Sequence, residues 1–267
     1  MSSLMNVNDF TPFDILRPKE WTVPLVFASP HSGRNYPEAF VKASRLDPVA
    51  LRRSEDAFVD EVFAAAPACG APLLCAEFPR AFIDANREAF ELDPAMFADP
   101  LPDYVNTSSP RIAAGLGTIA KIVTNGVDIY HSPLKFEDAR HRIDTFHRPY
   151  HEALKKLLID TKARFGGCLL VDCHSMPTSA VPGGRRRGKA VDVVLGDCFA
   201  TACAPGVTEA ARTAFEAADF TVACNKPYAG GYTTSHYGRP EEGVHVLQIE
   251  INRGLYMDEK RVRRGAG

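Results

Sequence analysis

Short runs of apolar residues that stop abruptly at polar residues dominate the hydrophobic pattern of this chain. Near-continuous apolar strands of this kind are typical of a sheet that is covered on both faces. The pattern predicts six strands, at residues 23–29, 71–76, 167–172, 191–196, 220–224 and 244–251.

Helical periodicity fills much of the sequence between these runs and predicts helices at residues 47–66, 149–164 and 205–218. Pro149 stands near the first turn of the second helix, where proline is well tolerated. Strands that alternate with helices predict an α/β fold, a three-layer sandwich with a mixed, mostly parallel sheet. We interpret residues 93–118 as an irregular excursion. Without a repeat or a long linker, we expect one domain over residues 1–267, with a core at roughly 20–260.

Composition limits the classes of protein to be considered. The 267 residues are 45% hydrophobic and carry a formal net charge of −2, which argues against a nucleic-acid or anionic-membrane surface. The one dense basic run, Arg185–Arg187 with Lys189, is interpreted as a solvated loop. No stretch approaches the ~20 apolar residues of a membrane span, and the N-terminal residues lack the pattern of a secretory signal. Seven cysteines without a C-x-x-C pair predict free thiols and a cytoplasmic protein.

Two histidines stand at the ends of predicted strands, where α/β sheets bind their ligands. His31 follows the first strand, and His174 follows the third. Each imidazole could simply cap a loop, but two in equivalent positions favour a divalent metal ion, with a carboxylate as third ligand. Candidates for that carboxylate are Glu55, Asp56 and Asp60, at the start of a predicted helix. Asp172 could orient an imidazole from outside the ligand set.

Glu250 lies in an otherwise apolar strand, where a carboxylate is costly unless it is paired or functional. Beside a metal site it would act as a general base for an attacking water. The alternative is a buried ion pair with Arg253 or another arginine.

A polar segment follows the second predicted strand. Asn86 and Arg87 could grip a substrate carboxylate, and Arg80 could reach a developing oxyanion. The alternative is a loop held together by an ion pair between Asp84 and an arginine.

The remaining histidines carry weaker signals. His147 and His151 are interpreted as solvated or loop-bound histidines, because Pro149 makes a shared helical face doubtful. His236 lies in a glycine-rich segment, residues 230–238, that could be a substrate flap or an ordinary surface loop. The signatures of serine hydrolases, P-loop proteins and dinucleotide-binding proteins are absent from the sequence.

Several of these segments together resemble the N-formylglutamate amidohydrolase (N-formylglutamate deformylase) family over roughly residues 20–260. The resemblance is carried by Ser29-Pro30-His31-Ser32-Gly33, Glu55-Asp56, Asp84-Ala85-Asn86-Arg87, Cys173-His174-Ser175-Met176-Pro177, Asn225-Lys226-Pro227-Tyr228 and Glu250-Ile251-Asn252-Arg253-Gly254-Leu255-Tyr256-Met257.

The resemblance implies a fold similar to zinc carboxypeptidases and aspartoacylase, and hydrolysis of N-formyl-L-glutamate to formate and L-glutamate in histidine degradation. It implies one divalent ion, with zinc as first choice. The implied roles are His31 and His174 as ligands, Glu250 as base, Arg80 at the oxyanion, and Asn86 and Arg87 at the substrate. We further expect Arg253 and the glycine-rich segment, with Gly231 and Tyr232, to help hold the two carboxylates of the substrate.

One position departs from that wider group, which has an acid three residues after the first histidine. Arg34 stands there in this chain. The acid ligand must therefore come from elsewhere, and we expect Asp56 rather than Glu55.

Two alternatives remain at this point. One is the same chemistry on another N-acyl acidic amino acid; the other is a non-catalytic protein of this fold that binds a metal or an amino acid. Metal identity and oligomeric state are not readable from these residues.

Overall fold

A computed structural model of the chain describes residues 10–123, 126–181 and 190–265. The basic run at 185–189 lies outside the described residues. Contacts between Cα atoms group the chain into two compact units, each made of three segments. The first unit comprises residues 1–14, 30–57 and 75–153, and the second comprises 15–29, 58–74 and 154–267. The single domain over residues 1–267 therefore stays a prediction.

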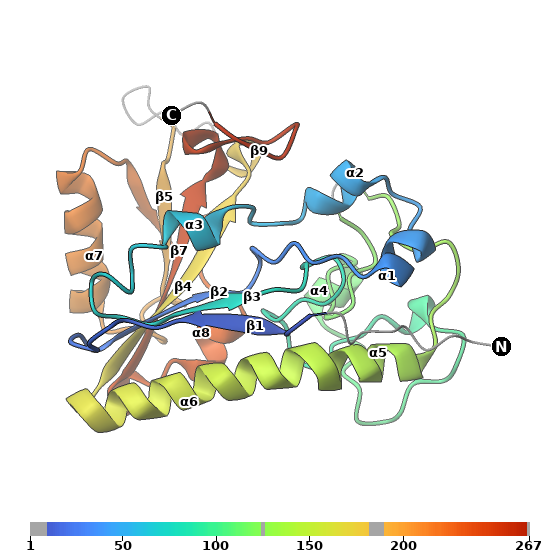
Figure 1. The fold of residues 1–267 in the computed structure, drawn as a ribbon, viewed down its shortest axis with the longest axis horizontal. Helices are drawn as coiled ribbons and strands as arrows, with labels where there is room; N and C mark the ends of the chain where they lie inside the picture. The colour runs from blue at the N-terminus through green and yellow to red at the C-terminus, as the bar shows by residue number, and fades with distance from the viewer. Residues whose placement is uncertain (1–9, 124–125, 182–189, 266–267) are drawn as a thin grey trace. The chain divides into compact units, whose positions relative to one another are not determined.

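Most of the sheet belongs to the second unit. Within the described residues it has seven strands in the order β1-β3-β2-β4-β7-β5-β6 (Figure 1). Strand β4 is parallel to both β2 and β7, β5 is antiparallel to β7, and β6 is parallel to β5. The sheet is therefore mixed and mostly parallel, as predicted. The strands are β1 Phe13–Leu16, β2 Leu25–Ser29, β3 Leu73–Ala76, β4 Cys168–Met176, β5 Val193–Gly196, β6 Val222–Cys224 and β7 Val244–Asn252.

All six strands predicted from the apolar runs are present, and two details differ. Strand β1 was not predicted, because its four residues alternate between half-buried and exposed positions and form no apolar run. Strand β4 continues to Met176, so His174 lies within the strand rather than in a turn after it.

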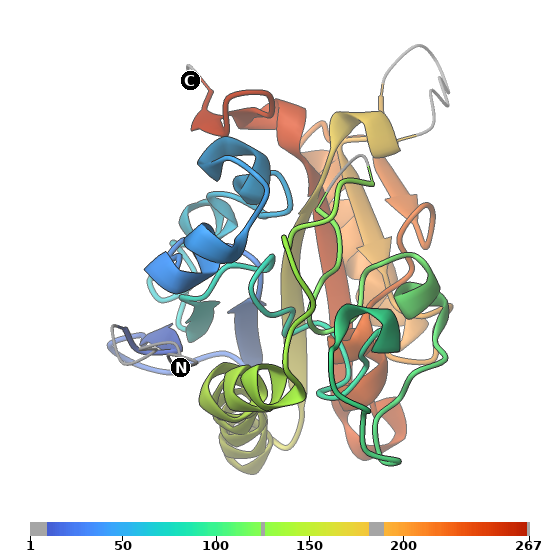
Figure 2. The same cartoon turned by 90° about the vertical axis from the view of Figure 1, so that its right-hand side faces the viewer.

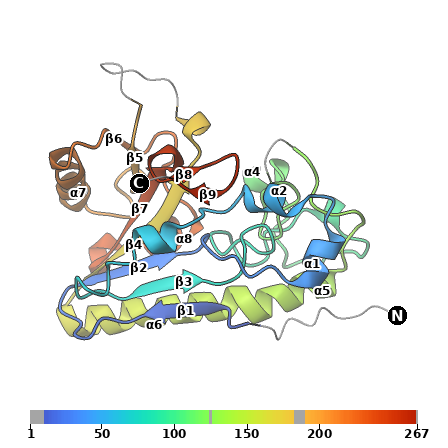
Figure 3. The same ribbon diagram turned by 45° about the horizontal axis from the view of Figure 1, so that its top comes forward.

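The apolar core of the second unit lies on one face of β4, β5 and β7. It contains the inward-facing pairs of each strand, Val171 and Cys173, Val193 and Leu195, and Leu247 and Ile249. Helix α7 (Pro205–Ala217) covers this face with Val207, Ala211 and Phe215, spaced four residues apart along one side (Figure 3). Val59 of helix α3 (Val59–Val62) packs into the same core.

Helix α8 (Tyr232–Tyr237) lies on the opposite face of the sheet. The hydroxyl of Thr234 is 3.4 Å from Asp172 Oδ2 and 3.4 Å from Gln248 Oε1, and both side chains alternate with the core residues of their strands. The expectation of a flap or surface loop over residues 230–238 is therefore wrong, since this segment forms a helix that begins after Gly231.

The helix predicted at residues 47–66 is interrupted. Helix α2 (Pro48–Arg52) is capped by Asp47, which accepts hydrogen bonds from the backbone N–H groups of Val49 and Ala50. The chain then leaves the helical path, and Phe58 has a left-handed backbone, with a φ of 67°, immediately before α3. Tertiary contacts of the intervening residues outweigh the helical periodicity, so Glu55 and Asp56 lie in a non-helical segment rather than on a helix.

The first unit contains helices and loops around an aromatic core. Its short helices include α1 (Glu38–Ala43), α4 (Pro110–Ala113) and the 3-10 turn Pro94–Met96. Phe82 is fully buried and its ring lies 5.3 Å from that of Phe40 and 5.4 Å from that of Phe146. The stretch at 93–118, green in Figure 2, is largely irregular, as expected.

The long helix begins earlier than predicted. Helix α5 (Phe136–Arg142) continues through a π-helical turn (Ile143–His147) into α6 (Arg148–Phe165). Proline lacks the N–H that a helix interior requires, and π turns are a common way to relieve a local mismatch in a helix. Pro149 therefore does not mark the helix start, and His147 and His151 lie on one continuous helix.

The other elements are short. They are the 3-10 turns Thr178–Ala180, Pro240–Glu242 and Arg253–Leu255 and the antiparallel pair β8 (Met257–Asp258) and β9 (Arg263–Arg264). All seven cysteines are free thiols. Among the described residues, no helix has the length and apolarity that crossing a membrane requires.

Candidate functional site

His31 lies in a tight turn directly after β2. A side chain on Gly33 would place its Cβ 2.2 Å from the carbonyl oxygen of Phe78, so this turn requires glycine. Asn35 then donates its backbone N–H to the carbonyl of Glu77 at 3.0 Å. These close backbone contacts fix the His31 turn against the polar segment that follows β3.

Two carboxylates hold the imidazole of His31, which is 1% exposed. Its Nε2 is 2.7 Å from Asp84 Oδ1, and its Nδ1 is 3.3 Å from Asp56 Oδ2. The backbone N–H of Asp56 also donates to the carbonyl of His31 at 3.0 Å. A carboxylate that accepts from Nε2–H leaves Nδ1 as the nitrogen with a lone pair for a metal ion.

The sequence left open whether Glu55 or Asp56 faces the site, and their contacts differ. Glu55 accepts hydrogen bonds from the Tyr36 hydroxyl at 2.7 Å and from Arg52 Nε at 3.0 Å. Burial, followed by the charge of Glu55, raises the pKa of Tyr36, so this phenol stays protonated and keeps donating. Glu55 therefore holds the side chains of Tyr36 and Arg52 in place, whereas Asp56 is the carboxylate that contacts His31.

Asp84 is the centre of a buried charge cluster. Besides His31, it accepts from Arg80 Nε at 3.1 Å and from the backbone N–H of Asn86 at 2.8 Å, and Arg87 Nη2 lies 3.6 Å away. Burial alone would raise the pKa of Asp84, but Arg87, His31 and Arg80 outweigh it and hold that pKa well below its usual value. The ion pair between Asp84 and an arginine, one of the two interpretations of this segment, is present.

The proposed substrate residues of this segment are held firmly. Arg87 donates from Nε to the carbonyl of Leu116 at 2.8 Å and from Nη1 to the carbonyl of Asn86 at 2.6 Å. Burial lowers the pKa of Arg87, although Asp84 opposes that shift. Asn86 is 5% exposed, and Arg80 keeps about a quarter (26%) of its side chain exposed.

Sequence reasoning missed the role of His147 and His151. The Nε2 atom of His147 is 2.9 Å from the carbonyl oxygen of Arg87, and that of His151 is 2.8 Å from the carbonyl oxygen of Ala85. Their rings lie 4.3 Å apart, so the two side chains do share one helical face. They support the segment of Asp84 to Arg87 from the long helix; the four-residue spacing was the signal for this.

His174 projects from β4 in the second unit and is 3% exposed. Its Nε2 is 3.0 Å from Oδ1 of Asp172, two residues earlier on the same face of the strand. Asp172 thus holds this imidazole in the same way as Asp84 holds that of His31. Each imidazole thus has one ring nitrogen next to a carboxylate that fixes the ring.

Glu250 lies beside His174 across the sheet. The two residues are register partners on the parallel strands β4 and β7, so their side chains lie on the same face. Gln248, the partner of Asp172, donates from Nε2 to Glu250 Oε1 at 2.6 Å. Glu250 is 7% exposed, and this hydrogen bond fixes one oxygen of its carboxylate.

The other residues predicted for the substrate lie in the second unit. Arg253 follows β7 and donates from Nε to Ser175 Oγ at 3.2 Å. Gly231 is the N-cap of α8, and Tyr232 is its first residue, with its ring stacked on His236 at 4.7 Å.

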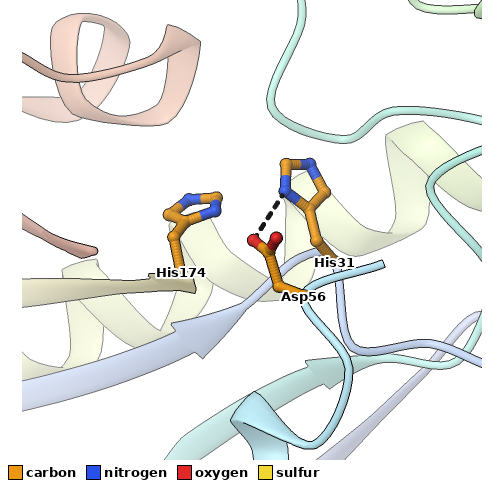
Figure 4. Close-up of side chains that lie close together, drawn as sticks. All are labelled: His31, Asp56 and His174. Atoms are coloured by element: carbon orange, nitrogen blue, oxygen red, sulfur yellow. Dashed lines mark hydrogen bonds and ion pairs between the residues drawn. The ribbon is translucent and has the colours of Figure 1, made fainter. Parts of the chain in front are cut away.

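Three of these side chains offer ligand atoms to one position. One ligand atom from each of His31, Asp56 and His174 lies within 4.8 Å of the other two, and all three residues are buried (Figure 4). A tetrahedral zinc with bonds of about 2.0–2.1 Å has ligand atoms about 3.3–3.4 Å apart. The 3.3 Å between His31 Nδ1 and Asp56 Oδ2 equals such an edge. Two imidazoles and one carboxylate are a donor set that suits a catalytic divalent ion.

A mixed α/β sheet and a set of buried imidazoles and carboxylates are typical of an α/β enzyme. The sequence model of the family named N-formylglutamate amidohydrolase matches residues 23–257. The chain belongs to this family and is an amidohydrolase.

Individual relatives agree with this assignment. The chain is 28% identical over 251 residues to an N-formylglutamate deformylase of Pseudomonas aeruginosa, covering 92% of this chain and 87% of the relative. It is 27% identical over 238 residues to an N-formylglutamate deformylase of Pseudomonas putida, covering 89% and 83%.

Two solved structures are similar in fold. The crystal structure of an N-formylglutamate amidohydrolase from Ralstonia eutropha JMP134 superposes with a TM-score of 0.89 at 36% identity, covering 97% of this chain and 92% of that one. A gene product of Agrobacterium tumefaciens shares the fold alone, with a TM-score of 0.60 at 18% identity and the same coverage of 97% and 92%.

Proposed function

We propose that this protein hydrolyses the formyl amide of N-formyl-L-glutamate to formate and L-glutamate, as a step of histidine degradation, with one zinc ion held by His31, Asp56 and His174. The observation that carries the proposal is the convergence of these three buried ligand atoms within 4.8 Å. The names of the relatives support the substrate. Seven free thiols fit a reduced, cytoplasmic setting.

A bound divalent ion would polarise the formyl oxygen and lower the pKa of an attacking water. Asp84 and Asp172 contribute by fixing the orientation and tautomer of the two imidazoles. Their hydrogen bonds to the two Nε2 atoms hold the imidazole rings in place, so the rings would not need to reorganise when a cation binds.

Glu250 is the proposed general base. It removes a proton from the attacking water and then donates that proton to the leaving nitrogen of glutamate. The hydrogen bond from Gln248 holds the carboxylate of Glu250 in one orientation. Its position as the register partner of His174 places this carboxylate on the face that carries the second imidazole.

Arginines and backbone turns are the proposed substrate contacts. Arg80, the more exposed arginine at Asp84, donates to the oxyanion that forms on the formyl oxygen. Asn86 and Arg87 bind one carboxylate of the substrate, and the bonds that Arg87 donates to the carbonyls of Leu116 and Asn86 fix its guanidinium before substrate arrives. Arg253 and the turn at Gly231 and Tyr232 bind the other carboxylate.

Elemental analysis combined with a deformylation assay tests this proposal. We expect about one divalent ion per chain, loss of turnover with a chelator, and recovery on adding zinc. Steady-state kinetics on N-formyl-, N-acetyl- and N-succinylglutamate should favour the formyl compound. A preference for a longer acyl group would replace the substrate and keep the chemistry, whereas no turnover on any of the three with metal supplied would refute the proposal.

The variant Glu250→Gln tests the base. It removes the ability to accept a proton but preserves shape, so turnover should fall by at least 100-fold, within the range typical of a general base, while metal content stays unchanged. Glu241→Gln changes an exposed glutamate of the same unit and serves as the matched control. Near-normal turnover of Glu250→Gln would exclude this residue as the base.

A further inference from the structure

The first unit contains a cavity of about 160 Å³ whose wall includes none of the residues assigned above to the metal or the substrate. Its polar lining is supplied by Arg45, Lys121, Asp128, Tyr130, His131 and Ser132. Its volume is close to that of an engineered cavity of about 150 Å³ that accommodates benzene. It therefore has room for a molecule of about six non-hydrogen atoms.

Behind this wall lies a cation without a counter-ion. Arg142 is 1% exposed, and among the described residues it forms no ion pair and its Nε and Nη2 have no hydrogen-bond partner. Its guanidinium carbon lies 4.3 Å from the ring centre of Phe82, with the rings of Phe40 and Tyr130 at 5.7 and 5.6 Å. Aromatic faces offset part of the cost of burying this charge. They do not neutralise it.

Tyr130 connects this cation to the cavity. Arg142 Nη1 donates to the Tyr130 oxygen at 2.7 Å, and within the described part of the chain the Tyr130 O–H meets no acceptor. A phenol that accepts a hydrogen bond from a cation is polarised, which makes its own O–H a stronger donor. Tyr130 is one of the residues that line the cavity, and its hydroxyl is the polar group of this side chain.

The charges around the cavity sum in favour of an anion. Arg45 forms no ion pair with any described residue; its Nη2 donates to the carbonyl of His131 at 3.2 Å, and its other N–H groups stay available. Lys121 is balanced by Asp93 at 3.7 Å. Asp128 opposes an anion, but Arg45 and Arg142 together outnumber it.

We propose that this cavity binds a small oxyanion, a carboxylate or a phosphate, through the Arg45 guanidinium and the Tyr130 hydroxyl. Arg142 contributes through Tyr130 and through its charge. The exposed carboxylate of Asp128 lowers the affinity of the site, because a like charge in the wall repels the ligand. Removing the charge of Arg45 should therefore weaken anion binding, and removing the charge of Asp128 should strengthen it.

Calorimetric titration of the metal-loaded protein with inorganic phosphate and with acetate, at constant ionic strength, tests the proposal. The anion that binds more tightly identifies the chemistry. We expect saturable 1:1 binding. Arg45→Gln and Tyr130→Phe should each weaken it at least tenfold, and Asp128→Asn should strengthen it severalfold. Arg140→Gln, which removes an exposed arginine of the same unit outside the cavity wall, should leave it unchanged.

Binding must also persist after treatment with a chelator, since both anions could coordinate a metal ion. Loss of binding with the metal would assign the anion to the metal site and overturn the proposal. So would the absence of saturable binding, or equal affinity in Arg45→Gln and wild type. Arg45 is exposed, so its variant should fold, and its unfolding temperature confirms this independently.

Discussion

Replacement of Asp84 by asparagine should destabilise the protein and weaken metal binding at the same time. Asparagine has nearly the same shape, and its oxygen can still accept from His31 and from the backbone N–H of Asn86. Its amide nitrogen, however, would face Arg80 Nε at the position of an oxygen that now lies 3.1 Å away. The N–H groups of that amide would then point at the N–H groups of the arginines, and the negative charge that balances Arg80 and Arg87 would be lost.

The magnitude follows from the burial of this cluster. Asp84 is 3% exposed and Arg87 is 7% exposed, so solvent screens their interaction poorly. Breaking a buried ion pair on one side costs about 3–5 kcal/mol. For a chain of this size about 2–4 °C accompany each kcal/mol, so the unfolding temperature should fall by roughly 6–20 °C.

The effect on the metal should be separate and measurable. Removing a carboxylate that orients a metal-binding histidine typically costs about 10–100-fold in affinity. Competition for zinc with a chromogenic chelator gives the dissociation constant, and scanning calorimetry gives the unfolding temperature. Asp103→Asn, at an exposed aspartate of the same unit, is the control. An Asp84→Asn protein with zinc affinity within threefold of wild type would refute the role assigned to Asp84.

Three further predictions follow from other contacts. Asp56→Asn should lose bound zinc. Glu55→Gln should retain zinc but unfold at a lower temperature, because Glu55 holds Tyr36 and Arg52 instead of the ion. Metal analysis of both variants shows which of the two carboxylates is the ligand. The variants His147→Gln and His151→Gln weaken the hydrogen bonds to the carbonyls of Arg87 and Ala85. Each should cost about 0.5–1.5 kcal/mol of stability and raise KM more than it lowers kcat. His141→Gln is the control and should have no effect. Burial would raise the pKa of Asp197, but hydrogen bonds from Ala200, Asn225 and Thr208 outweigh it and lower that pKa below the ordinary value of an aspartate. The stability that this carboxylate contributes is therefore complete above the ordinary pKa and is lost as the pH falls through the lower native pKa. Urea unfolding of wild type and Asp197→Asn should differ by a constant amount at pH 5–7 and converge in stronger acid.

The fold could be predicted from the sequence wherever hydrophobicity alone decides. The apolar runs that became β4 and β7 are buried on both faces, and such runs have few alternative structures. The prediction failed where a tertiary contact competes with periodicity. Residues 53–58 continue an amphipathic pattern, yet the contacts of Glu55 and Asp56 draw them out of the helix.

The two aspartates that orient the imidazoles show the same limit. Asp172 stands two residues before His174 on one strand, so alternation along the strand places both side chains on one face, and the sequence reveals the pair. Asp84 is 53 residues from His31 and meets it only through the folded turns at Gly33 and Asn35. A single sequence contains no signal for such a contact, and Asp84 was therefore recognised only as a possible partner of an arginine.

One pattern in the sequence did contain the arrangement of the base. Asp172 and His174 on one strand and Gln248 and Glu250 on another are polar residues at alternate positions, each interrupting an apolar run. Alternation requires that the polar members of each strand share a face, and a core on the other face favours a register in which both polar pairs lie on the same side of the sheet. The observed register pairs Asp172 with Gln248 and His174 with Glu250. Ending the predicted strand at Asp172, where the first polar residue occurs, hid this relation; a strand that continues through its polar face would have predicted His174 and Glu250 as neighbours.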